Sequence, residues 1–204
     1  GDLTVTDNLT ATAQGSIDQI DNRTLTVGGG TNLTAVDATL NNAGNSFFAP
    51  VNLDVAGQAS LRGAGRLEVA GRVEESATLE TQNLVLRNLA VGAGLNLKAN
   101  TIDQTDSLVV QGATQIESTG AVNLTLSNDF VNGVTLTGSN GATVNLTDKN
   151  SISVSGQAGA VNINATESAD SVVTLHNLRV QSLTVNANTV RNADQSNFAG
   201  AVNV

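Results

Sequence analysis

Aliphatic and polar residues alternate along most of the chain in short runs. The alternation is clearest in residues 3–5, 25–27, 84–86, 95–97, 152–154 and 183–185. A period of two residues is typical of β-strands that bury one face. Glycine, asparagine, aspartate and serine separate the runs, which predicts short strands joined by tight turns. Residues 75–89 come nearest to helical spacing, but their β-branched residues, their asparagines and their Leu-Val-Leu run favour a strand.

The strands recur in units of about 20 residues, a period typical of solenoids. The tripeptide Val-Asn-aliphatic occurs at residues 51–53, 122–124, 144–146, 161–163 and 202–204. Its last four copies are 22, 17 and 41 residues apart, which is close to one, one and two units. A longer similarity links SIDQIDNRTLTVGGGTNLT, which begins at Ser16, to TIDQTDSLVVQGATQIE, which begins at Thr101.

Three of the four phenylalanines lie in one recurring phrase. Phe47, Phe130 and Phe198 each follow one or two small polar residues, and each precedes a valine by four positions. The polar and small residues around each ring suit turns, and phenylalanine is normally buried. We therefore predict that each ring fills a gap at a corner of the coil. The alternative is that the rings are exposed and dock a sugar or a protein partner.

The composition favours a thin aliphatic core. Hydrophobic residues make up 40% of the 204 residues, but aromatic residues make up only 2%, and methionine and tryptophan are absent. A β-sandwich usually needs large buried aromatic residues, whereas a parallel β-helix can stack uniform aliphatic layers. We predict an all-β, right-handed parallel β-helix with coils of about 20 residues. Residues 1–204 are expected to form a single β-helical repeat segment of a much longer fibrous protein, with ten coils spanning about 50 Å.

Charge and cysteine content exclude several classes of partner and chemistry. The net charge is −9, and only nine residues are lysine or arginine. Nucleic acids and anionic membranes bind basic patches, so we expect neither as a partner. The chain has no cysteine, which excludes disulfides, thiolate metal sites and a cysteine nucleophile. The longest apolar run is about five residues, around residues 47–51, so no membrane insertion is expected.

The short strands VNLTL and VTLTG, the coils near 20 residues and the phrase NDF-xx-G-V-T-L resemble the repeat region of filamentous haemagglutinin-like adhesins. These large bacterial exoproteins are exported by two-partner secretion, and the resemblance covers nearly the whole chain. It implies a secreted fibre at the bacterial cell surface that serves attachment, cell–cell aggregation, biofilm formation or display of a tip domain. The implied partners are a host or bacterial surface glycan or protein, or a matrix polysaccharide. The family's Asn-Pro-Asn motifs are not in this sequence, whose one proline is Pro50.

Catalysis requires convergent acid, base or nucleophilic groups, and the sequence offers few. His176 is the one histidine, and no serine and aspartate pattern of a catalytic triad accompanies it. The densest acidic cluster is interleaved with four arginines and is interpreted as a charged face exposed to solvent. It consists of Glu68, Glu74, Glu75 and Glu80 with Arg62, Arg66, Arg72 and Arg87. We expect no enzymatic activity. The alternatives are a β-helical polysaccharide-degrading enzyme and the shaft of a contact-dependent toxin exoprotein.

Metal, cofactor and modification sites are weakly indicated. The acidic pairs Asp18/Asp21 and Asp103/Asp106 are interpreted as turn residues, and residues 27–37 lack the glycine spacing of calcium-binding repeats. Gly28–Gly30 is interpreted as a turn and not as a phosphate loop. No metal and no cofactor are expected. The Asn-x-Ser/Thr triplets are candidate glycan acceptors; they begin at Asn8, Asn22, Asn32, Asn123, Asn145 and Asn164. Neither end resembles a polar cap, which predicts end-to-end self-association.

Overall fold

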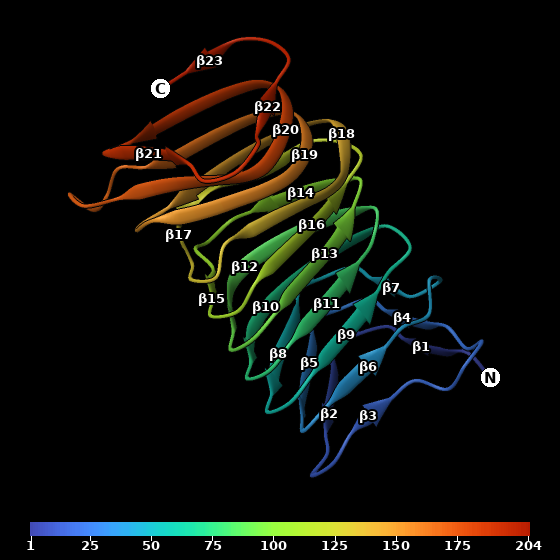
Figure 1. Cartoon of the computed structure of the whole chain (residues 1–204). Helices are drawn as coiled ribbons and strands as arrows, with labels where there is room; N and C mark the ends of the chain where they lie inside the picture. Colours follow the sequence, from blue (N-terminus) through green and yellow to red (C-terminus); the bar gives the residue numbers. More distant parts are fainter.

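The computed structural model describes residues 1–137 and 141–204. Its strands are numbered β1 to β23, the described residues contain no helix, and the strand pairs are parallel. The chain winds into a β-solenoid of about ten turns with coils of about 20 residues (Figure 1). The predicted all-β, parallel solenoid is therefore confirmed.

Strands on the same side of successive coils stack into three faces. Face A contains β2 (Leu9–Thr12), β5 (Thr31–Ala35), β8 (Val51–Val55) and β15 (Val109–Val110). Face B contains β3 (Ile17–Asp18), β6 (Ala38–Leu40), β9 (Ala59–Arg62), β11 (Ala77–Glu80), β13 (Leu95–Ala99), β16 (Thr114–Ser118) and β21 (Thr189–Asn192). Face C contains β1 (Leu3–Val5), β4 (Leu25–Val27), β7 (Ser46–Phe47), β14 (Thr101–Gln104) and β23 (Val202–Asn203).

Longer strands turn a corner and belong to two faces. Those that run from face C to face A are β10 (Arg66–Val73), β12 (Asn83–Val91) and β17 (Val122–Phe130). Those that run from face B to face C are β18 (Val134–Asp148), β19 (Ile152–Ala165) and β20 (Val172–Ala187). The short strand β22 (Asn197–Phe198) pairs with the middle of β20. In the C-terminal coils, two long sides and a short segment between them therefore replace the three-sided coil.

Alternation of residues sets which side chains enter the core. In β8, the valines and the leucine of Val-Asn-Leu-Asp-Val are buried, while the asparagine and aspartate between them are exposed. The Val-Asn-aliphatic tripeptides at 122–124, 144–146 and 161–163 stack in register on face C. The copy at 202–204 lies one coil beyond Leu183, which fills the place of the missing copy. The spacing of 41 residues therefore corresponds to two coils.

Single residues with positive φ turn the corners inside the long strands. They are Gly71 (φ 105°) in β10, Asn88 (φ 44°) in β12, Gly156 (φ 101°) in β19 and Asn177 (φ 45°) in β20. Glycine and asparagine adopt this backbone region more readily than other residues. At Gly71 there is also no room for a side chain, because a Cβ would come within 2.1 Å of the carbonyl oxygen of Leu53.

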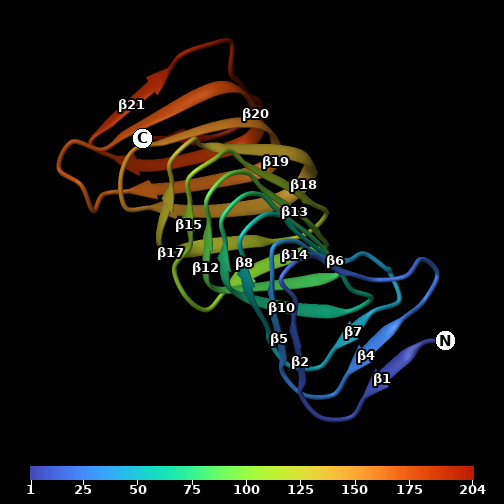
Figure 2. The same cartoon turned by 90° about the horizontal axis from the view of Figure 1, so that it is seen from below.

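The core is one column of aliphatic residues that runs from coil to coil. Most of its members are leucine, valine, isoleucine and alanine, and Phe130 is the largest fully buried side chain. In the view from below, the C-terminal strands are rotated relative to the N-terminal ones (Figure 2). Twist of this kind is the usual behaviour of stacked β-strands.

Candidate functional site

A fully buried asparagine lies two residues before Phe47. Asn45 donates from Nδ2 to Gln19 Oε1 at 2.9 Å, and Gln19 Nε2 donates back to Asn45 Oδ1 at 2.7 Å. Asn45 Oδ1 also accepts the backbone N–H of Leu25 at 2.9 Å, and Nδ2 donates to the carbonyl of Leu40 at 3.1 Å. These bonds satisfy a polar side chain that is shielded from water. We call Gln19 and Asn45 the N-terminal amide cluster.

The same arrangement recurs two residues before the second ring. Asn128 is fully buried and exchanges hydrogen bonds of 2.9 and 3.0 Å with the side chain of Gln104. Its Oδ1 accepts the backbone N–H of Leu108 at 2.9 Å. Its Nδ2 donates to the carbonyls of Leu124 and Thr147, both at 3.1 Å. Gln104 and Asn128 are the central amide cluster, and the two glutamines are those of the repeated Ile-Asp-Gln tripeptide.

A serine takes the place of the asparagine at the third ring. Ser196 lies two residues before Phe198, and its Oγ accepts the backbone N–H of Leu178 at 3.2 Å. This N–H matches those of the leucines that donate to the two buried asparagines. We call this place the serine corner.

A common register explains the recurring phrase. Val27 stacks on Phe47, Val110 on Phe130, and Val180 on Phe198. Each ring therefore stacks on the valine of a Leu-x-Val segment in the preceding coil. The polar residue two positions before the ring accepts the backbone N–H of the leucine in that segment. The valines four positions after the rings begin β8, β18 and β23. Sequence reasoning missed the Leu-x-Val partner, which its spacing of 18 or 20 residues before Asn/Ser-x-Phe could have identified.

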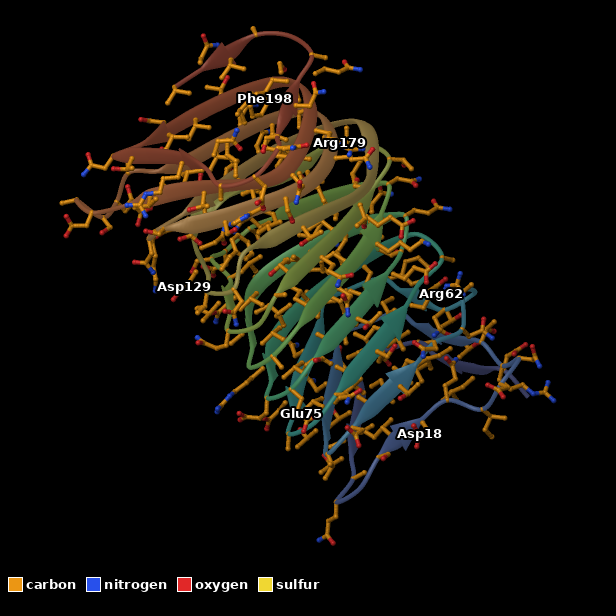
Figure 3. The ribbon with its side chains drawn as sticks, viewed as in Figure 1. Asp18, Arg62, Glu75, Asp129, Arg179 and Phe198 are labelled. Carbon is orange, nitrogen blue, oxygen red and sulfur yellow. The ribbon has the colours of Figure 1, made fainter. Side chains whose placement is uncertain are left out.

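The three copies lie on different sides of the coil. Phe47 is on face C and Phe130 is on face A. Phe198, which is labelled in Figure 3, is in β22, between faces B and C. The spacings of 83 and 68 residues between the rings are therefore not whole numbers of coils. Phe47 and Phe130 are 6% and 1% exposed, and Phe198 is half-buried. Phe48, which is outside the phrase, is 72% exposed.

A buried carboxyl group adjoins the central amide cluster. Asp148 is 1% exposed, and it accepts the backbone N–H groups of Phe130 and Asn150, each at 2.8 Å. Burial raises the pKa of Asp148 above its ordinary value of 3.8, and the two N–H donors oppose this shift. On the adjacent surface, Lys149 pairs with Asp129 at 2.9 Å, and this carboxylate raises the pKa of the lysine.

The charged candidates from the sequence are distributed among separate ion pairs. His176 Nδ1 lies 2.9 Å from Asp194 Oδ2 at an exposed site. Three of the four glutamates of the acidic cluster form separate ion pairs: Glu68 with Arg66 and Arg87, Glu74 with Arg72, and Glu80 with Arg62. Exposed pairs of this kind contribute little to stability.

The remaining candidates lie in turns and on outer strand faces. Asp103 accepts a hydrogen bond from Asn123 Nδ2 at 2.8 Å, and Asp106 accepts the N–H of Ser107 at 3.0 Å. At Gly29, a Cβ would come within 2.4 Å of Asn8 Oδ1, so this turn needs glycine. Among the described residues, no group of three or more histidine, aspartate and glutamate side chains could hold a metal ion.

The six asparagines of the Asn-x-Ser/Thr triplets fall into two groups. Asn8, Asn22 and Asn32 are exposed. The other three are half-buried on face C. The amide nitrogens of Asn123 and Asn145 donate within a ladder of side chains, to Asp103 and to Asn123 respectively, each at 2.8 Å. A glycan on either nitrogen would leave it a single N–H for the hydrogen bond within this ladder.

Comparison with known proteins identifies the family of this solenoid. The model of the family "Repeats of unknown function (DUF5649)" matches residues 1–54 and 74–137, which is more than half of the chain. The chain therefore belongs to this repeat family. No curated protein and no solved structure matches it. No helix in the described part of the chain is long and apolar enough to cross a membrane.

Proposed function

We propose that the chain is a shaft segment of a secreted bacterial surface fibre that mediates attachment or cell–cell aggregation. The observation that carries this proposal is the continuous pairing of face B, in which each strand from β3 to β21 is hydrogen-bonded to the next. One coil thus holds the next along the whole rod. Such a solenoid can extend a binding domain away from the cell, because its stability is a sum over neighbouring coils.

Two further observations support a mechanical role. The recurring aromatic phrase is the sequence feature most suggestive of a ligand site, and its ring is buried in two of the three copies. The short strands and the NDF-xx-G-V-T-L phrase resemble the repeats of filamentous haemagglutinin-like exoproteins. The rival role, a polysaccharide-degrading enzyme, requires carboxyl groups that converge on one sugar linkage, whereas three of the four glutamates of the acidic cluster form separate ion pairs.

The test removes coils from the full-length protein in the bacterium that produces it. Ala77, Leu95 and Thr114 occupy the same place in successive coils. Deletion of residues 77–113 therefore removes two whole coils in register, whereas deletion of residues 77–85 removes about half a coil. A shaft should tolerate the first deletion, with surface exposure and attachment retained, and should lose both after the second.

Two results would contradict the proposal. One is loss of attachment by a surface-exposed protein that lacks only residues 77–113, because those coils would then carry a binding site. The other is a native protein that external protease does not reach on intact cells. Incubation with acidic and neutral polysaccharides tests the rival role, and sustained release of new sugar ends would favour an enzyme.

A further inference from the structure

Face B carries a ladder of alternating charges along one margin. Arg62, Glu80, Lys98 and Glu117 occupy equivalent places in β9, β11, β13 and β16. Arg62 pairs with Glu80 at 3.0 Å and Lys98 with Glu117 at 3.1 Å, and all four side chains reach solvent. Arg62 projects outward from the end of β9 (Figure 3). We call these four residues the charge ladder.

Small polar side chains form a second ladder beside the charges. This ladder runs from β6 to β19, all its members are uncharged, and consecutive members are paired in register. They are Thr39, Ser60, Thr78, Asn96, Gln115, Thr135 and Ser155. Shallow grooves run along this ladder, one bordered by Ser60 and Thr78 and one by Asn96 and Gln115. Short side chains of this kind leave an even surface that another flat surface can approach closely.

We infer that face B binds face B of a second copy of this chain, with the two rods side by side and antiparallel. Charge complementarity between the two ladders favours this arrangement. A two-fold axis that lies between the faces and passes midway between β11 and β13 reverses the order of the ladder. It sets Arg62 opposite Glu117 of the second copy, and Glu80 opposite Lys98. Every charge then faces its opposite, and each existing ion pair becomes part of a larger network.

The same ladder disfavours a parallel, in-register arrangement. Parallel stacking would set Glu80 against Glu80 and Lys98 against Lys98 of the second copy, and like charges directly opposite one another are destabilising. The antiparallel arrangement also matches the neutral ladder, because Thr78 meets Asn96 and Ser60 meets Gln115. Hydroxyl and amide groups can donate to and accept from one another in either pairing. This lateral pairing goes beyond the proposed shaft role, which one unpaired rod could perform.

Charge exchange tests the inference on the purified 204-residue chain. Glu80→Lys sets lysine against Lys98 of the second copy twice in each dimer. Like-charge contacts cost enough to lower the association constant at least about tenfold, and sedimentation equilibrium at low salt measures it. Lys98→Glu should weaken association in the same way. An equimolar mixture of Glu80→Lys and Lys98→Glu should associate as the parent does, because lysine then faces glutamate at both places.

A matched control separates this effect from the loss of an ordinary surface ion pair. Glu74 pairs with Arg72 at 2.6 Å and lies just beyond β10, on the corner next to face A. Glu74→Lys removes a comparable pair away from the charge ladder, and association should stay at the parent value. Higher salt should weaken the parent dimer, because ions screen exposed charges.

Cross-linking reports the orientation, since the parent chain has no cysteine. A mixture of Ser60→Cys and Gln115→Cys should form an inter-chain disulfide, whereas Ser60→Cys alone should not, because its two copies would be three strands, about 14 Å, apart. A disulfide in Ser60→Cys alone would overturn the antiparallel arrangement. Parent-like association of Glu80→Lys alone, as end-to-end contact would give, would overturn the role of face B. A parent chain that stays monomeric at low salt would also overturn this role, whether or not the chain binds a polysaccharide.

Discussion

The N-terminal and the central amide clusters have the same internal hydrogen bonds but differ in how the next coil covers them. In each, a buried asparagine pairs with a glutamine of the preceding coil and accepts a leucine N–H. Asn128 of the central cluster also donates to Thr147 in the following coil, and Asp148 of that coil accepts the N–H of Phe130. Side chains thus bond the central cluster to the following coil, whereas in the N-terminal cluster the backbone carbonyl of Asn45 accepts the N–H of Ala64 in the following coil at 2.8 Å.

The serine corner extends this comparison to a third, more open site. Ser196 offers one short oxygen in place of a two-sided amide, and the ring of Phe198 is half-buried. The three sites show that one phrase can close a corner on any side of the coil. The energy that the phrase contributes should follow the degree of cover, which is greatest at the central amide cluster and least at the serine corner.

The largest expected effect is at the best-covered ring. Phe130→Ala should lower the free energy of unfolding by about 3–5 kcal/mol, because it leaves a cavity in a closed core. Phe198→Ala should cost clearly less, since its ring already touches solvent. Chemical unfolding followed by circular dichroism measures both, with Phe48→Ala as an exposed control that should melt like the parent. A Phe130→Ala chain that keeps its stability but loses a binding partner would identify the ring as a docking residue.

The next largest effect is expected at the polar residues of the central amide cluster and the serine corner. Asn128→Ala leaves the N–H of Leu108 and the carbonyl of Leu124 without their side-chain partner, at about 1–3 kcal/mol for each group that stays unpaired. Ser196→Ala removes one bond near solvent and should cost about 1 kcal/mol or less. Unfolding titrations of the two variants decide the matter. Equal losses would show that cover by the next coil does not set the contribution.

Two buried threonines offer a smaller effect of opposite sign. Among the described side chains, the hydroxyls of Thr31 and Thr114 are buried without a hydrogen-bond partner. Their neighbours in the next coil are Val51 and Val134, so valine fits the same places. Thr31→Val and Thr114→Val should each stabilise the chain by about 1 kcal/mol. Melting temperatures of the two variants show whether the N-terminal coil and the central coil gain the same stability. A lower melting temperature for either variant would show that the threonine hydroxyl forms a hydrogen bond.

The smallest effect is a pH dependence confined to the central coils. Because the pKa of Asp148 is raised by burial, its protonated form is the more compatible with the fold. The stability contributed by this group is fully present below the unfolded pKa, near 3.8, and is lost as pH rises through the folded pKa. Relative to Asp148→Asn, the parent chain should therefore become less stable as pH rises from about 3 to 7. A constant difference in melting temperature over this range would contradict the raised pKa.

The sequence predicted the solenoid because its fold depends on local, repeated signals. The alternation around Leu25 and Leu183 and the spacing of the Val-Asn-aliphatic tripeptides follow directly from strands stacked in register. The predicted turns after Phe47 and Phe130 also agree with the strand boundaries, because Val51 and Val134 each begin a strand. These features need only the residues of one coil and its neighbour.

What the sequence did not predict depends on pairing between coils. The bond between Gln104 and Asn128 joins residues 24 positions apart, and neither residue alone differs from a surface amide. Nothing in the sequence around Asp148 marks this carboxyl group as buried. Of the charge ladder, only Arg62 and Glu80 belong to the mixed-charge cluster that the sequence indicates, because strand register decides which charged residues become neighbours.

Amide hydrogen exchange at the three leucines tests the central claim most directly. The account holds that a side chain of the following coil satisfies each leucine N–H, and it predicts slow exchange at Leu25 and Leu108 and intermediate exchange at Leu178. In Asn128→Ala, protection at Leu108 should fall while Leu25 and Leu178 keep theirs. Exchange at Leu108 as fast as in an exposed loop of the parent chain, or an equal loss of protection at all three leucines in Asn128→Ala, would contradict the account.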